Sequence, residues 1–321
     1  MKDWRNFGIK VRNFPDKNYR SIWKNLKTIR TGTGVPKELD PMYAEFYDIS
    51  IGSSCKTGRC PFCYASSNPD DSQNSDIIKS WRYWMRHYLP DKEENGIIFT
   101  EKPFQVAIGG RGEPTEHPEF SEFLEDVWSY GVVPNYTTNG VILGSIYSNS
   151  KYSKTAIKIL DYTSRFVGGV AVSFGNPDLK KDAKNAIKAL LNYGDTNINI
   201  HHIISDKKSV EDFLRSWDTF GDDILYHVLL PLMNLGRSEK GFSDPEVFDL
   251  LITELEKRNI KNVAFGSHFY NILKTQKVLK IWDYPPESLS KHMILDKGKI
   301  IITQNSFDLT PLIKKEYGTS R

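Results

Sequence analysis

The sequence predicts an α/β protein built from parallel β-α-β units. Short runs rich in β-branched and aromatic residues recur along the middle of the 321-residue chain, and longer segments with helical spacing of apolar residues follow them. Gly, Pro, Asn and Ser separate these segments. A strand followed by a helix six times over favours a parallel sheet over an antiparallel meander.

The expected elements can be placed along the chain in order. Strands are expected at residues 44–51, 104–109, 132–137, 167–174, 197–204, 224–230 and 262–266. Helices are expected at residues 75–88, 118–130, 151–164, 179–193, 209–220 and 245–258. The last of these has an acidic first turn and basic residues near its end, as the helix dipole favours. Residues 293–307 predict a β-hairpin that turns at Lys297 and Gly298.

We expect three parts: a basic N-terminal segment at 1–42, the α/β part at 43–266, and a C-terminal extension at 267–321 that lacks cysteine. The Gly- and Pro-containing stretch 31–41 predicts a linker. Nine Lys and Arg residues and only two Asp residues occur in the first thirty positions. This block predicts either a contact surface for an anionic substrate or a solvated basic face.

The composition is that of a soluble globular protein, with 39% hydrophobic and 26% charged residues. No stretch approaches the 18 or so apolar residues of a membrane span, and the first residues lack the apolar core of a signal peptide. A net charge of +3 is too small to favour nucleic-acid binding by itself. We therefore expect a cytoplasmic protein without a membrane partner, in a compartment where thiols stay reduced.

The cysteines of the chain are Cys55, Cys60 and Cys63, all within the stretch CKTGRCPFC. An odd, clustered set of thiols favours a metal site over a disulfide framework. A zinc site would need a histidine to join them, without the usual paired spacing, and a plant-type ferredoxin cluster would need a fourth cysteine. A [4Fe–4S] cluster held by three cysteines leaves one iron open to a small molecule.

The stretch resembles the cluster loop of the radical S-adenosylmethionine (SAM) enzymes, in which SAM chelates the open iron through its amino and carboxylate groups. The commonest family spacing is C-x3-C-x2-C, and this chain has one more residue between Cys55 and Cys60. Phe62 stands where the family usually has an aromatic residue. Residues 109–118 (GGRGEPTEHP) resemble the Gly-Gly-Glu motif of the family, with Arg111 replacing a Gly.

The resemblance implies a partial (β/α)6 TIM-like barrel whose site lies at the C-terminal ends of the strands. It implies Cys55, Cys60 and Cys63 as cluster ligands. The implied SAM-binding residues are Phe62, Gly112, Glu113, Ser173, Met233 and Asn234, with the Glu113 carboxylate accepting from the SAM ammonium group. Candidate substrate-side residues are His201, His202 and His268. Because side chains alternate along a strand, only one of His201 and His202 can point into the barrel.

The resemblance implies an oxygen-sensitive enzyme that reductively cleaves SAM at a [4Fe–4S] cluster. The resulting 5′-deoxyadenosyl radical would abstract hydrogen from a substrate, with flavodoxin or ferredoxin as the reductant. A peptide or protein substrate is favoured because extended segments flank the barrel, and a nucleotide or another anionic small molecule is the alternative. A zinc-stabilised nucleic-acid-binding protein and a pure electron carrier are the hypotheses from other classes.

Overall fold

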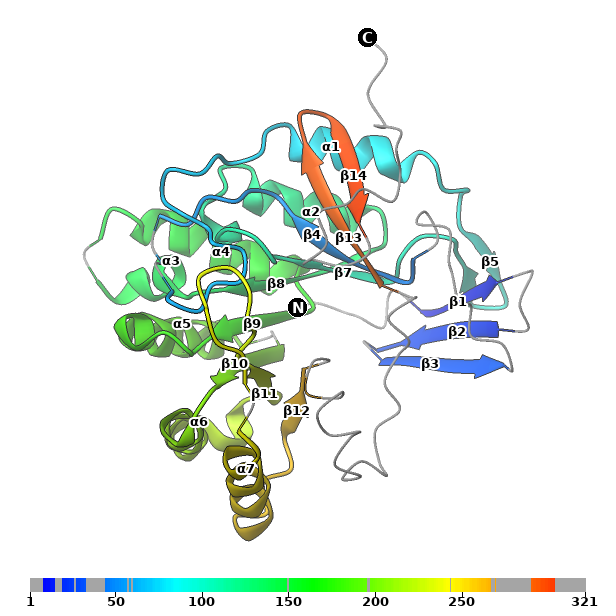
Figure 1. The fold of residues 1–321 in the computed structure, drawn as a ribbon. Coiled ribbons are helices and arrows are strands. Elements are labelled where there is room, and N and C mark those ends of the chain that lie inside the picture. Colours follow the sequence, from blue (N-terminus) through cyan, green and yellow to red (C-terminus); the bar gives the residue numbers. More distant parts are fainter. Residues whose placement is uncertain are drawn as a thin grey trace.

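The computed structural model describes residues 8–14, 19–25, 27–32, 44–56, 58, 60–148, 150–194, 197–242, 244–266, 269 and 290–303 (Figure 1). These residues form two sheets, one of nine strands and one of five. Within the described ranges, every helix is too short or too polar to span a bilayer.

The nine-stranded sheet contains, in spatial order, β12 (Val263–Phe265), β11 (Tyr226–Pro231), β10 (Asn197–Ile204), β9 (Gly169–Ser173), β8 (Val133–Thr138), β7 (Gln105–Ile108), β4 (Phe46–Ser50), β13 (Ser290–Asp296) and β14 (Lys299–Thr303). All neighbouring pairs are parallel except β13 and β14. The seven expected strands are all present. Since β12 and β14 are the two edges, the barrel is partial and open, as the predicted fold class requires.

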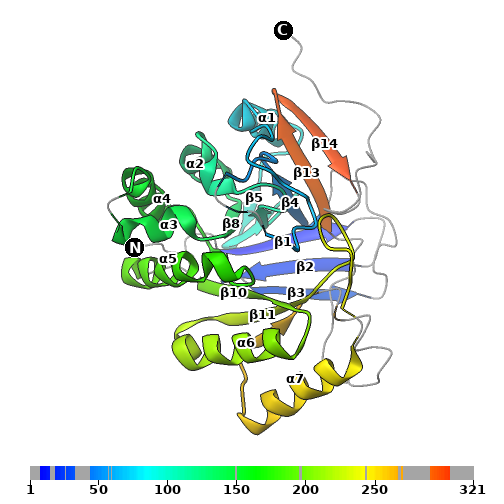
Figure 2. The same ribbon diagram turned by 60° about the vertical axis from the view of Figure 1, so that its left-hand side comes forward.

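The α-helices are α1 (Ile77–Met85), α2 (Phe120–Ser129), α3 (Val141–Gly144), α4 (Ser153–Phe166), α5 (Lys180–Tyr193), α6 (Lys207–Phe220) and α7 (Pro245–Lys257). Short 3-10 turns are η3 (Pro114–Glu116), η4 (Ser145–Tyr147), η5 (Pro177–Leu179) and η6 (Gly221–Asp223). All six expected helices are confirmed, whereas α3 was not expected. Figure 2 shows the helices in a row along one face of the large sheet.

The core lies between this sheet and its helices, and the opposite face of the sheet is more polar. In β10, Ile198, Ile200 and Ile204 are buried, while Asn199 and the other alternate residues are partly exposed. Alternation along a strand separates the two faces in this way. A fully buried Ile or Phe side chain contributes about 1.5–3 kcal/mol, so the helix-facing side anchors the fold. The more polar face of the sheet lines the barrel interior.

The predicted C-terminal hairpin is present as β13 and β14. Lys297 and Gly298 at its turn have φ of 51° and 71°, and positive φ at both central residues is what a type I′ turn requires. β13 pairs in parallel with β4, the first strand of the barrel. The Asn74 side chain donates to the Leu295 carbonyl at 2.8 Å, which ties the hairpin to the loop after β4. The hairpin therefore extends the barrel sheet.

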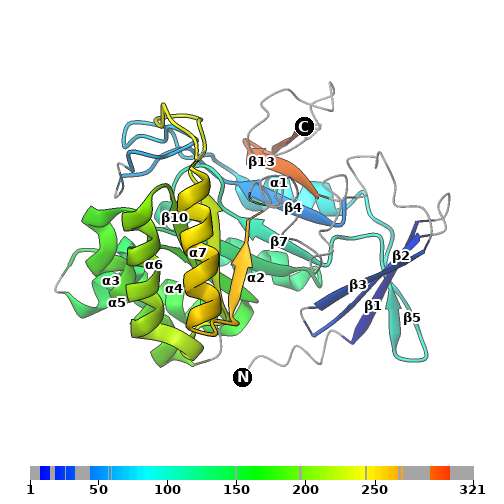
Figure 3. The same cartoon turned by 60° about the horizontal axis from the view of Figure 1, so that its bottom comes forward.

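A second sheet, not expected from the sequence, contains β3 (Lys27–Gly32), β2 (Tyr19–Lys24), β1 (Ile9–Phe14), β6 (Ile97–Phe99) and β5 (Lys92–Glu94) in spatial order. It joins N-terminal strands to a hairpin from the connection between α1 and β7. Figure 3 shows it beside the barrel. Most of the expected linker at 31–41 lies outside the described residues.

This small sheet buries part of the basic N-terminal block. Lys10 and Arg12 are 4% and 2% exposed. Arg12 donates to the Ala44 carbonyl at 2.8 Å, and burial lowers the pKa of Lys10 to about 8. Arg30 forms a 2.8 Å ion pair with Glu45. Lys10 and Arg12 are thus held inside the protein, where an external anion does not reach them.

Candidate active site

The loop that follows β4 carries the three cysteines at the C-terminal edge of the barrel sheet. All three thiols are free and partly exposed. The Cys55 amide donates to the Asn68 carbonyl at 3.1 Å, and the Cys63 amide donates to the Cys60 carbonyl at 3.2 Å. These bonds fold the loop back on itself, so the thiols stay at the rim of the barrel.

Two amide side chains from neighbouring strand ends approach the cysteine sulfurs. Asn139, after β8, places Nδ2 3.8 Å from Cys55 Sγ, and Asn176, after β9, places Nδ2 3.4 Å from Cys60 Sγ. Amide donors stabilise negative charge on sulfur. The stretches TTNG (residues 137–140) and VSFGN (residues 172–176) contain Asn139 and Asn176, but nothing in the spacing of either stretch singles out its asparagine.

The thiols of Cys55 and Cys60 lie in surroundings that favour the neutral form. Burial raises the pKa of Cys55 to about 12, and the nearby Glu113 carboxylate acts in the same direction. Burial also raises the pKa of Cys60, against the hydrogen bond from Asn176. Thiolates at these positions therefore need a positively charged partner, which a metal centre supplies.

The donor set fits a cluster better than a single ion. Across the described ranges, no three His, Cys, Asp or Glu side chains converge closely enough to hold one metal ion. Cysteines that bind separate irons of a cluster do not need to converge on one point. With three thiols on one loop and two amide donors on their sulfurs, the residues present suit a cysteine-bound cluster.

Gly112 allows the loop after β7 to pack against the cysteine loop. Its φ is +67°, and a Cβ there would lie 2.7 Å from the Ser54 carbonyl oxygen. The Gly112 amide donates to Ser67 Oγ at 3.0 Å. Only glycine tolerates both the left-handed conformation and the close approach, so this part of the predicted motif has a structural basis.

Glu113, the predicted acceptor for the SAM ammonium group, is 4% exposed. Its Oε1 accepts from Thr115 Oγ1 at 2.6 Å and Thr138 Oγ1 at 2.7 Å, and its Oε2 accepts from the Asn139 amide at 2.7 Å. Burial raises its pKa, and these hydrogen bonds oppose the shift. The carboxylate therefore links the loop after β7 to the end of β8, and its contact with SAM stays a prediction.

The loop after β11 contacts the cysteine loop through residues that the sequence did not single out. Gly236 has φ of +64°, and a Cβ there would collide with the carbonyl oxygens of Cys63 and Tyr64. Arg237 donates to the Cys60 carbonyl at 3.1 Å, to Asn68 Oδ1 at 2.8 Å and to the Ser67 carbonyl. Both residues belong to the segment LLPLMNLGR. In this segment the sequence pointed to Met233 and Asn234 as cofactor-binding residues, and not to Gly236 or Arg237.

Met233 and Asn234, the predicted cofactor-binding residues of that segment, lie earlier in the same loop. Met233 is partly buried and Asn234 is exposed. Phe62 is partly buried, and its ring reaches the backbone after β9, because a Cβ on Gly175 would lie 3.1 Å from Phe62 Cζ. Ser173 ends β9 and is partly exposed. The Phe62 ring thus lies beside Gly175, two residues after Ser173 in the chain.

The two strand histidines point to opposite faces, as the alternation predicts. His201 lies opposite Ser173 in the register of β9 and β10, and burial lowers its pKa to about 4. His202 is 3% exposed on the helix side, where its Nε2 lies 3.1 Å from His227 Nδ1 and its ring contacts Phe213. His202 is therefore a core residue, and His201 is the candidate that faces the barrel interior. His268 lies outside the described residues.

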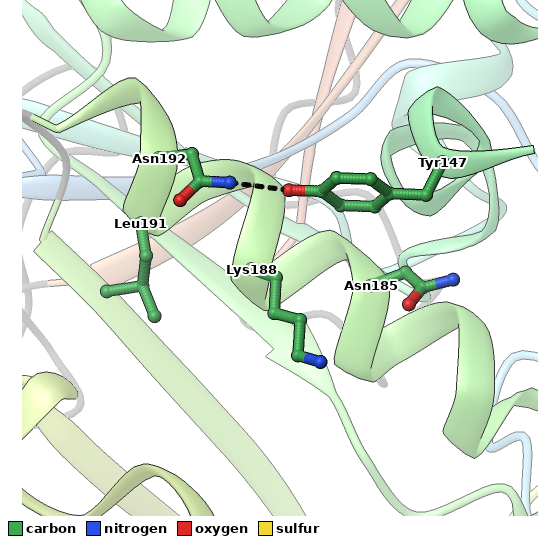
Figure 4. A pocket seen from close by; sticks show the side chains of 5 residues that line it. All are labelled: Tyr147, Asn185, Lys188, Leu191 and Asn192. Atoms are coloured by element: carbon green, nitrogen blue, oxygen red, sulfur yellow. Dashed lines mark hydrogen bonds between the residues drawn. The ribbon is translucent and has the colours of Figure 1, made fainter.

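A separate hollow of about 430 Å³ lies on the outer helices, between α5 and η4. It is lined by Tyr147, Asn185, Lys188, Leu191 and Asn192, and Asn192 donates to the Tyr147 hydroxyl at 2.7 Å (Figure 4). None of the predicted site residues lines it. The hollow is therefore distinct from the site at the cysteine loop.

Comparisons with known proteins identify the fold. No family model matches the chain, and no curated protein matches its sequence. The structure of SuiB from Streptococcus suis bound to S-adenosylmethionine is similar, with a TM-score of 0.59 and 14% identity, over 86% of this chain and 63% of SuiB. SuiB bound to the precursor peptide SuiA gives a TM-score of 0.57 and 13% identity, over 84% and 62%.

A radical SAM methyltransferase from Sphaerobacter thermophilus gives a lower TM-score of 0.47, with 15% identity over 80% of this chain and 76% of that one. This chain spans less than two thirds of the length of SuiB. The similarity to SuiB covers 86% of this chain, whose main feature is the open parallel barrel described above. The chain therefore has the fold of SuiB.

Proposed function

We propose that this chain is a radical SAM enzyme that generates a 5′-deoxyadenosyl radical and abstracts hydrogen from a peptide or protein substrate. The observation that carries the proposal is the set of three thiols on the loop after β4, with Asn139 and Asn176 aimed at two of the sulfurs. This set lies at the edge of a parallel barrel, where such folds place their chemistry.

The proposal assigns the cysteines to a [4Fe–4S] cluster and leaves one iron for SAM. When bound, the cluster supplies the electron that cleaves SAM, and a flavodoxin or ferredoxin would supply that electron in turn. Cys55, Cys60 and Cys63 would hold the cluster. The chain's other contribution is placement: Gly112 and Gly236 let neighbouring loops pack on the cysteine loop, and Arg237 fixes its carbonyl groups.

The SAM-binding assignments are part of the same proposal. Phe62 would pack on the adenine, Ser173 would bind the ribose, and Met233 and Asn234 would contact the cofactor from the loop after β11. Glu113 would accept from the SAM ammonium group while it holds the Asn139 amide. His201 would face the substrate. Placement of SAM in the barrel interior would limit the access of water to the radical.

A peptide is the substrate class that the similarity favours, because SuiB was solved with the precursor peptide SuiA. The alternative, a nucleotide or another anionic small molecule, relied on the basic N-terminal block. Lys10 and Arg12 of that block are buried, and Arg30 is paired with Glu45, which weakens the alternative. The zinc hypothesis lacks a converging set of ligands among the described residues.

The test is anaerobic reconstitution with iron and sulfide, followed by reduction in the presence of SAM. We expect about four irons per chain and formation of 5′-deoxyadenosine, measured by liquid chromatography. Cys60→Ala should abolish that product, whereas Ser53→Ala, in the same loop, should retain it. Zinc near one per chain with no iron would refute the proposal, as would full activity of Cys60→Ala.

A further inference from the structure

Asp48 and His292 lie side by side on the inner face of the barrel sheet. In the register of β4 and β13, His292 stands opposite Asp48, so the two side chains point to the same side. Tyr47, Ile49 and Met293, which alternate with them, are fully buried in the core under the helices. Asp48 and His292 therefore face the barrel interior. Figure 1 shows β13 beside β4.

The Asp48 carboxylate has no hydrogen bond or ion pair with another of the described residues. Its side chain is deep in the protein yet keeps part of its surface accessible. Burial raises its pKa to about 6, and no charge among the described residues acts on it. At neutral pH the barrel thus contains a carboxylate whose charge is not balanced by a described side chain. Unpaired buried charge is costly, so a bound cation would stabilise it.

His292 is an unsatisfied group on the same face. It is fully buried, and no side chain in the described part of the chain hydrogen-bonds to Nδ1 or Nε2. Burial lowers its pKa to about 4, and Arg111 acts in the same direction, while the neighbouring Asp48 backbone opposes the shift; the ring is neutral. A neutral imidazole offers one acceptor nitrogen and one N–H. The acceptor nitrogen and the Asp48 carboxylate both suit a ligand that donates hydrogen bonds.

Gly110 joins this pair to the cysteine loop. A Cβ on Gly110 would lie 3.4 Å from Tyr64 Oη, 3.5 Å from Ser50 Oγ and 3.6 Å from His292 Cε1. Tyr64 follows Cys63 directly, so the His292 ring lies close to the loop that carries the proposed cluster. A ligand held by Asp48 and His292 would therefore lie in the part of the barrel interior that adjoins the reaction centre.

We propose that Asp48 and His292 bind a cationic group of the substrate, an amine or a guanidinium, inside the barrel. This inference rests on the proposed function, because it names a feature of the substrate of the same site. The N–H groups of such a cation pair with the carboxylate and with the imidazole nitrogen. A lysine or arginine side chain of a peptide supplies the cation, and so does a free α-amino group.

Calorimetry on the full chain, purified anaerobically and loaded with SAM, tests this with three probes. Nα-acetyl-lysine amide carries a side-chain amine, Nα-acetyl-norleucine amide carries none, and norleucine amide carries only the α-amine. We expect wild-type protein to bind at least one amine probe tenfold or more tightly than the acetylated norleucine probe. Tight binding of the lysine probe would identify a side-chain amine as the ligand, and tight binding of norleucine amide would identify an α-amine. Equal binding of all three probes would overturn the inference.

Asp48→Asn supplies the second arm, and Asp249→Asn on the exposed face of α7 is the matched control. Asp48→Asn should remove the preference for amines, and Asp249→Asn should keep it. A preserved preference in Asp48→Asn would also overturn the inference. Asn has the shape of Asp and carries no charge to bury, so the variant is expected to fold; if it does not, the wild-type probe comparison still decides.

The two proposals fail separately. Formation of 5′-deoxyadenosine by wild-type protein without any preference for amines would contradict only the cation site. An amine preference in protein that holds no iron would contradict only the radical SAM assignment.

Discussion

The guanidinium of Arg237 donates to the carbonyl oxygen of Cys60, 3.1 Å away, and so connects the loop after β11 to the loop after β4. The Arg237 amide also donates to the Cys63 carbonyl at 3.0 Å. One residue thus contacts the backbone of two of the three cysteines. This relationship makes the geometry of the thiols depend on a segment far from them in sequence.

Replacing Arg237 should loosen the cysteine loop. Arg237→Met keeps the length of the side chain and removes its hydrogen bonds, and hydrogen bonds from a charged group contribute about 2 kcal/mol to stability. We expect lower iron content after reconstitution and a lower free energy of unfolding, measured by iron assay and denaturant titration. Arg215→Met is the control, because Arg215 pairs with carboxylates on an exposed helix face. Equal iron content in the two variants would contradict this role.

Gly236→Ala should destabilise the protein by more than the left-handed backbone conformation at this position explains. A non-glycine residue at such φ costs about 1–2 kcal/mol. At Gly236 a Cβ would also collide with the backbone of the cysteine loop, whereas at Gly194, with φ of +83°, no atom lies within 4 Å of the added carbon. Thermal unfolding should therefore show a clearly larger loss for Gly236→Ala than for Gly194→Ala. Similar losses of stability in the two variants would mean that the loop after β11 can move away from the cysteine loop without a cost in free energy.

Glu113→Gln should weaken the connection between the loop after β7 and the end of β8. Glu113 Oε2 accepts from the Asn139 amide at 2.7 Å, and Oε1 accepts from two threonine hydroxyls. An amide nitrogen in place of Oε2 or Oε1 faces donors, so a buried donor is left unpaired at a cost of about 1–3 kcal/mol. We expect a lower unfolding free energy even without SAM. A variant that loses only SAM affinity would contradict the structural role.

Much of the barrel could be predicted from the sequence because its signals are local. The strand at residues 197–204 was predicted with the bounds that β10 has, since its first five residues, NINIH, alternate polar and apolar side chains. The small sheet was missed because Lys10 and Arg12 suggested a solvated surface, whereas both are buried beside Val11. Because charged residues are uncommon inside proteins, the local sequence pattern indicated an exposed segment in place of a buried strand.

The candidate site was predicted only where a motif marks it. The cysteines and Gly112-Glu113 belong to recognisable stretches, but Asn176, Gly236 and Arg237 are defined by contacts across the barrel. His292 was missed for a similar reason: its strand pairs with β4 across more than two hundred residues of chain, and no local periodicity reports such a pairing.

Asn176→Asp should move the reduction potential of the reconstituted cluster to more negative values. Asn176 Nδ2 lies 3.4 Å from Cys60 Sγ, and hydrogen bonds to cluster sulfurs stabilise the reduced, more negative state. Aspartate removes the donor and adds negative charge, while its oxygen can still accept from the Asp178 amide. A redox titration followed by electron paramagnetic resonance measures the shift. Asn192→Asp, at the outer hollow, is the control, and a shift of equal size there would point to charge alone.

The stacked pair His202 and His227 should make the protein less stable below pH 6.5. Burial lowers the pKa of His227 to about 4 and that of His202 well below its ordinary value, with His227 and His201 acting in the same direction on His202 and Asp212 opposing them. Between pH 6.5 and about 4 the unfolded chain therefore binds more protons than the folded one. Stability is fully present above pH 6.5 and falls as the pH decreases, by up to about 1.4 kcal/mol per pH unit for each histidine.

Denaturant unfolding at pH 7, 6 and 5 measures this dependence in wild-type protein and in the double variant His202→Leu/His227→Leu. The two rings pack against Phe213 in the core between β10, β11 and α6, so leucines keep the site apolar. Because His201 and His292 also have lowered pKa values, wild-type protein alone does not isolate the pair. The difference in unfolding free energy between the two proteins isolates the pair. As the pH falls, wild-type protein should lose more unfolding free energy than the variant. A difference that stays constant from pH 7 to pH 5 would show that the pair is protonated equally in the folded and unfolded chains.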